Sequence, residues 1–153
     1  MHIEHTIRTL NRLIQVCRDG EDFCGAGARG AASAELSVVL RHRGEEWGRL
    51  GDELQALVLL LGGEPATSAT LAARARHWGL GARLAVLGPA DATIIAAWQG
   101  TERQAEARYL ETLEGYLPER IRRTVSLQAD RVVGRADRIG DLPGSVALHS
   151  PSH

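Results

Sequence analysis

Charged side chains occur at positions where the periodicity of this sequence calls for apolar ones. Glu21 interrupts a stripe of apolar residues spaced by threes and fours between Ile3 and Cys24, and Arg43 interrupts the next such stripe. Burying a charge is costly unless an opposite charge, a metal ion or several hydrogen-bond donors meet it. These residues therefore predict either a carboxylate metal site or a buried ion-pair network.

Four long helices are predicted to position these residues. They cover residues 3–30, 33–61, 90–116 and 118–142, with Ser33 as the N-cap of the second helix. The first two helices should lie antiparallel because the link between them is very short. A mostly helical segment, residues 68–87, is long enough to cross the length of the bundle between helices two and three.

This connectivity is that of an all-α, ferritin-like four-helix bundle with up-down-down-up topology and a helical crossover. We expect one domain over residues 1–143, which Pro143 ends, and a disordered tail over residues 144–153.

The polar seam residues of the four helices fall at one level of this bundle. At 1.5 Å per residue, Glu21, Arg43, Glu102 and Arg131 lie about 14 to 18 Å from the end of the bundle that holds the link between helices one and two. The predicted buried polar layer consists of Glu21, Arg43, Glu102, Gln128, Arg131 and Arg135.

In ferritin-like carboxylate proteins this layer is a dimetal site, built from two Glu residues and two Glu-x-x-His motifs. The sequence contains no Glu-x-x-His, and a guanidinium such as that of Arg43 repels a dication and neutralises carboxylates. We therefore favour no cofactor, with Glu21 paired to Arg43 or to an arginine of helix four. The alternative is an iron protein with the atypical ligand set Glu21, Glu46, Glu53 and Glu102.

Several motifs together resemble a known family. They are the segments Cys17–Phe23 and Leu61–Pro65, Arg43 and Trp47 before Glu53-Leu54, and Trp78 in the crossover. In these motifs the chain resembles an uncharacterised bacterial family of ferritin-like four-helix bundles, related to rubrerythrin and stress-protein bundles. The match extends over nearly the whole folded chain, and it implies a ferritin-like fold and an association with stress.

The chain departs from this family pattern where metal ligands would lie. The pattern has an acidic pair after a glycine on helix three, where this chain has Thr101 and Glu102. On helix four it has His-Asp eight residues after a Gln, where this chain has Ala136 and Asp137. Residues 24–29 lack the second acid of helix one. The resemblance therefore implies that this member has lost much of a metal site.

Composition excludes several other functions. A net charge of −1 gives no basic field for nucleic acid or an anionic membrane, and no apolar run is long enough for a membrane span. Cys17 and Cys24 are expected as core thiols of a cytoplasmic protein. No nucleophilic triad or phosphate loop is present, and His42 with its neighbouring glutamates indicates a solvated face.

The sequence thus favours a non-enzymatic bundle that acts through self-association or a protein partner. A homodimer is expected because the chain has more apolar side chains than one bundle interior can hold. The surplus includes Val58, Leu59 and Leu60 on helix two and Trp78 and Leu80 in the crossover.

Overall fold

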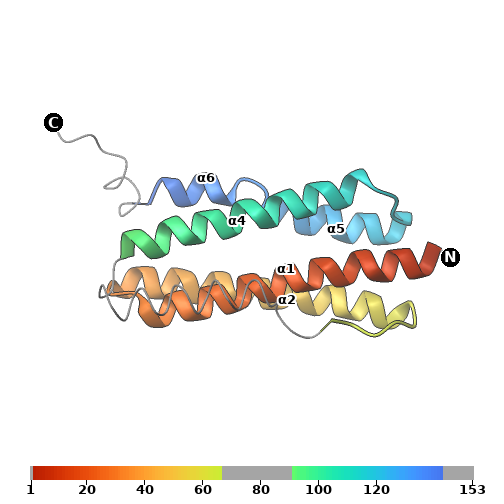
Figure 1. Cartoon of the computed structure of the whole chain (residues 1–153), viewed down its shortest axis with the longest axis horizontal. Coiled ribbons are helices and arrows are strands. Elements are labelled where there is room, and N and C mark those ends of the chain that lie inside the picture. The colour runs from red at the N-terminus through yellow and green to blue at the C-terminus, as the bar shows by residue number, and fades with distance from the viewer. Residues whose placement is uncertain (1, 67–90, 143–153) are drawn as a thin grey trace.

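A computed structural model describes residues 2–66 and 91–142 of the chain, and within these residues the protein is all-helical (Figure 1). The helices are α1 (His2–Gly30), α2 (Ala34–Leu60), α4 (Asp91–Glu114), α5 (Glu119–Val132) and α6 (Arg135–Gly140). The prediction of an all-α fold is confirmed. The predicted crossover and tail lie outside the described residues, and the domain limits stay a prediction.

The antiparallel pair of α1 and α2 forms as expected from its short link (Figure 1). Ser33 caps α2, because its hydroxyl accepts a hydrogen bond from the Leu36 N–H at 3.2 Å. The helix stops at the predicted double glycine, where Gly62 has a φ of 82°.

Glycines let α1 and α2 approach each other closely. A Cβ at Gly20 would lie 2.8 Å from ring atoms of Trp47, and one at Gly44 would lie 3.1 Å from the Cβ of Cys24. These glycines lower the intrinsic helix propensity, but they let a bulky indole and the neighbouring backbone pack without a clash.

The start of α4 is hydrogen-bonded to the link between α1 and α2. Asp91, at the start of α4, accepts hydrogen bonds from the Ala32 and Ser33 N–H groups at 2.8 and 2.9 Å. From there α4 runs in the same direction as α2, and α5 and α6 return along α4 (Figure 1). The apolar faces of α1, α2, α4 and α5 form one core, which includes Leu10, Leu40, Trp47, Ile94 and Val125.

The prediction of one continuous fourth helix is wrong. The chain breaks between α5 and α6 at Gly134, which has a φ of 86° and therefore cannot continue a right-handed helix. The Gly134 N–H donates to Glu106 Oε1 of α4 at 2.9 Å, so the break is held from the neighbouring helix.

No helix among the described residues has the length and apolar character needed to span a membrane.

Candidate functional site

A buried ion pair joins α2 to α4 at the centre of the bundle. The side chains of Arg43 and Glu102 are 2% and 0% exposed, and Arg43 Nη2 donates to Glu102 Oε1 at 2.6 Å. Arg43 Nε lies 3.1 and 3.2 Å from the two carboxylate oxygens. Trp47 donates from Nε1 to Glu102 Oε2 at 2.9 Å, and its ring centroid lies 4.6 Å from Arg43 Cζ. Both oxygens of Glu102 are therefore satisfied by protein donors.

Glu46 is the second acid that binds Arg43, and its side chain is 16% exposed at the edge of the core. Arg43 Nη1 and Arg135 Nη2 both donate to Glu46 Oε1, the second at 3.3 Å. Arg131 Nη1 lies 3.7 Å from Glu46 Oε2. We call this group the arginine cluster; it comprises Arg43, Glu46, Trp47, Glu102, Arg131 and Arg135.

The arginine cluster also holds the end of α5. The last carbonyl groups of a helix have no intrahelical donor, and Arg43 Nη1 donates to the Arg131 carbonyl at 3.3 Å. A cation at a helix C-terminus is favoured by the helix dipole. Arg43 thus connects α2 to α4 and to the break after α5.

The charges within the cluster do not balance, because three guanidinium groups surround two carboxylates. Burial alone would lower the pKa of Arg43, but its bonds to Glu102 and Glu46 outweigh burial and raise that pKa above its ordinary value. Burial, and then repulsion from Arg43, lower the pKa of Arg135. Within residues 2–66 and 91–142, moreover, the Arg135 Nε is a buried donor without a partner. Arg43 is thus the satisfied cation and Arg135 the surplus one.

A second, neutral network lies farther along the bundle. Tyr109 donates from its hydroxyl to Gln128 Oε1 at 2.7 Å, and its oxygen lies 3.4 Å from the sulfur of Cys17. Gln128 Nε2 donates to the Leu50 carbonyl at 3.2 Å and to Glu53 Oε1 at 2.8 Å. We call Cys17, Tyr109 and Gln128 the neutral network.

Burial keeps the groups of the neutral network protonated. It raises the pKa of the Cys17 thiol to about 12, and it raises the pKa of Tyr109 well above its ordinary value. Burial likewise raises the pKa of Cys24. Since the thiolate is the nucleophilic form, neither cysteine is an activated nucleophile.

The predicted single polar layer is wrong at two of its six residues. Glu21 is not buried among the arginines: its side chain is 42% exposed and Glu21 Oε1 accepts from Arg18 Nη1 at 3.2 Å. Arg18 in turn donates to Asp52 at 2.9 Å on the surface of α2. Gln128 is buried, but it belongs to the neutral network. The remaining four residues, Arg43, Glu102, Arg131 and Arg135, do meet, although Arg131 and Arg135 lie at the rim with side chains 62% and 35% exposed.

The four acids of the alternative iron site are held by protein donors rather than grouped as one ligand set. Glu21 pairs with Arg18, Glu53 accepts from Gln128, and Glu46 and Glu102 take opposite sides of Arg43. Within residues 2–66 and 91–142, no three His, Cys, Asp or Glu side chains are grouped so as to hold a metal ion. The donors around Glu46 and Glu102 are three guanidinium groups and the indole of Trp47, a set that does not fit a divalent metal.

Four members of these networks were missing from the predicted layer: Glu46, Trp47, Cys17 and Tyr109. A signal existed for the first two, because Glu46 and Trp47 follow Arg43 by three and four residues and so share its side of α2. Tyr109 carried no such signal, since an aromatic ring at an apolar position is ordinary core.

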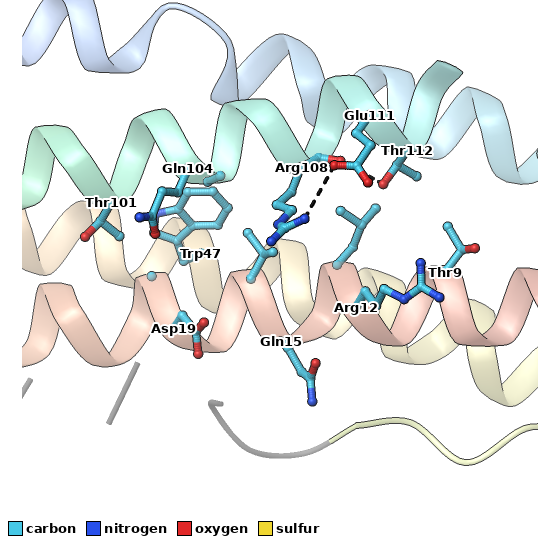
Figure 2. A pocket seen from close by; sticks show the side chains of 14 residues that line it. Thr9, Arg12, Gln15, Asp19, Trp47, Thr101, Gln104, Arg108, Glu111 and Thr112 are labelled. Carbon is cyan, nitrogen blue, oxygen red and sulfur yellow. Dashed lines mark hydrogen bonds and ion pairs between the residues drawn. The ribbon is translucent and has the colours of Figure 1, made fainter. Parts of the chain in front are cut away.

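A groove of about 430 Å³ lies between α1 and α4, beside the arginine cluster (Figure 2). Its inner wall is formed by apolar side chains and by the indole of Trp47. Its outer wall carries Arg12 from α1 and Arg108 from α4.

A family model matches most of the chain. The model of a domain of unknown function, DUF2383, matches residues 5–115. This span includes Arg43, Glu46, Trp47 and Glu102, whereas α5 and α6, with Arg131 and Arg135, lie beyond it. No curated protein matches the chain.

Proposed function

The chain belongs to the DUF2383 family, a domain of unknown function, and we propose that it is a non-enzymatic, ferritin-like bundle in which Arg43 takes the place of a metal ion. One observation carries this proposal: the guanidinium of Arg43 lies between Glu102 and Glu46 and binds both. In a carboxylate bundle, a metal ion has that position between acids of different helices. Arginine supplies the positive charge permanently and with fixed donor geometry.

Catalysis by the protein's own side chains has no support at this site. The acids are held by arginines, and the thiols of Cys17 and Cys24 are buried with raised pKa values. The role that remains for the bundle is an interaction in the cytoplasm, which the sequence resemblance associates with stress.

We place that interaction on the protein surface, as a homodimer or a complex with a protein partner. Leu59 and Leu60, at the end of α2, are 63% and 77% exposed, which is typical of an apolar contact surface. Val58, predicted to join this surface, is instead buried in the core. Trp78 and Leu80 lie outside the described residues.

The central test is the metal content of untagged protein purified from cells grown with added iron. We expect substoichiometric iron in the wild type. About two irons per chain, the content of a dimetal site, would overturn the proposal. The matched variants are Arg43→Gln, which removes the internal cation, and Arg49→Gln, which removes an exposed arginine of the same helix. Metal gained by the first variant alone would show that Arg43 excludes it.

Self-association is tested by sedimentation velocity at micromolar concentration. We expect a dimer that Leu60→Gln dissociates, with Leu127→Gln, on the exposed side of α5, as the control. A monomeric wild type would remove the homodimer from the proposal.

A further inference from the structure

The groove between α1 and α4 has the size and lining of a small-molecule site (Figure 2). Its volume of about 430 Å³ is within the range of ligand pockets in proteins. Leu13, Val16, Ala105 and Trp47 form its apolar wall, while threonine hydroxyls, including that of Thr9, lie at its edge. A ligand there would have an apolar body and a polar end.

The charged residues of the groove favour an anionic polar end. Arg108 is paired with Glu111 at 3.4 Å, but both side chains are about two-thirds exposed, so that the pair is weak. Arg12 has no hydrogen-bond or ion-pair partner within the part of the chain that the structure describes. Asp19, the other acid of the lining, points away from α4 in Figure 2. A carboxylate in the groove would therefore meet a free guanidinium.

We propose that this groove binds a small amphipathic anion, with its apolar body against Val16 and Ala105 and its carboxylate on Arg12. A guanidinium binds a carboxylate through two parallel hydrogen bonds, which fixes the orientation of the ligand. The apolar body is held by the surface that it removes from water.

Trp47 connects the groove, and so the bound anion, to the arginine cluster. This indole lines the groove, and its Nε1 donates to Glu102. The site is independent of the proposed function, because it needs neither a metal ion nor its exclusion. The metal analysis and the binding experiment can therefore fail separately.

The test is a titration of the full chain with decanoate, monitored by calorimetry and by tryptophan fluorescence. We expect saturable binding of one decanoate per chain. Arg12→Gln should weaken binding about tenfold, as expected for a lost charged hydrogen bond. The control is Arg8→Gln, an exposed arginine one turn earlier on α1 that does not line the groove; its affinity should equal that of the wild type.

Two further experiments test the roles of the apolar wall and of the anion site separately. Val16→Phe places a ring in the groove from a half-buried position, so the variant should fold and lose binding. Decanol, the neutral analogue, should bind at least about tenfold more weakly than decanoate. No binding by the wild type, equal weakening by Arg8→Gln and Arg12→Gln, full binding by Val16→Phe, or equal affinity for decanol would each overturn the proposal.

Discussion

The arginine cluster and the neutral network bury polar side chains in one bundle core, but with different balance between donors and acceptors. In the neutral network, the phenol of Tyr109 donates to Gln128 and the amide of Gln128 donates onward to Leu50 and Glu53. In the arginine cluster, three guanidinium groups share two carboxylates, and one buried N–H of Arg135 has no acceptor in the part of the chain that the structure describes.

This difference predicts which residues hold the fold together. A buried charge that loses its partner costs far more than a lost neutral hydrogen bond. The central pair of Arg43 and Glu102 should therefore dominate stability, and the neutral network should contribute less. Arg135, the surplus cation at the rim, should contribute least.

The largest effect is expected from separating the central pair. Arg43→Met leaves the carboxylate of Glu102 buried with only the indole donor. Glu102→Gln removes the fully buried charged partner of Arg43 and leaves it only Glu46 at the edge of the core. Each single change should lower the free energy of unfolding by about 3–5 kcal/mol. The measurement is urea unfolding followed by circular dichroism.

The double variant Arg43→Met with Glu102→Gln tests whether the two effects share one cause. Its loss should be smaller than the sum of the single losses by about 0.5–3 kcal/mol. The control is Arg108→Gln, which breaks an exposed pair and should cost at most about 1 kcal/mol. Strict additivity of the central changes would contradict a direct interaction.

A smaller effect is expected from breaking the neutral network at Tyr109. Tyr109→Phe keeps the ring but removes the hydroxyl that donates to Gln128 and contacts Cys17. Leaving the buried Gln128 oxygen without a donor should cost about 1–3 kcal/mol in urea unfolding. Thr112→Val, which removes an exposed hydroxyl on the same helix, should be nearly neutral. A Tyr109→Phe variant as stable as the wild type would mean that water replaces the phenol.

The neutral network also predicts a loss of stability in alkali. The pKa of Cys17 is about 12 in the folded protein, above that of an unfolded cysteine, near 8.5. The stability that the neutral thiol contributes is therefore complete below pH 8.5 and falls as the pH rises toward 12. Each such thiol can change the free energy of unfolding by up to about 1.4 kcal/mol per pH unit.

The measurement is urea unfolding between pH 8 and 10 for the wild type and Cys17→Ala. The variant should show a shallower decline with pH, whatever its absolute stability. Cys24→Ala should also flatten the decline, because burial raises the pKa of Cys24 as well. An unchanged slope in Cys17→Ala would show that its thiol ionises as readily in the folded chain as in the unfolded one.

Much of the fold could be predicted from helical periodicity and end signals. The apolar stripes, the cap at Ser33 and the stop at Gly62 fixed the ends of α1 and α2, because these signals are local. The break at Gly134 could not be predicted, since a glycine within a helical pattern is often tolerated. The break is held by a hydrogen bond from the Gly134 N–H to Glu106, which belongs to a different helix.

The polar site was predictable only in part, because its contacts join residues of different helices. Depth along the helices correctly put Arg43 and Glu102 at one level. It could not show the rotation of α1, which turns Glu21 toward Arg18 and solvent. Nor could it separate Gln128 from the cluster, because Gln128 and Arg131 are less than one turn apart on α5.

The smallest effect is expected where the charge is in surplus. Arg135 is partly buried beside Arg43, and its Nε has no acceptor among the described residues. Its hydrogen bond to Glu46 is to an oxygen that Arg43 already binds. Arg135→Met keeps the aliphatic stem and removes the repulsion, so its free energy of unfolding should lie within about 0.5 kcal/mol of the wild type or above it. Urea unfolding of Arg135→Met beside Arg43→Met directly compares two of the three arginines that contact Glu46. A loss above about 2 kcal/mol in Arg135→Met would contradict the comparison, because it would make the rim arginine a required partner of Glu46.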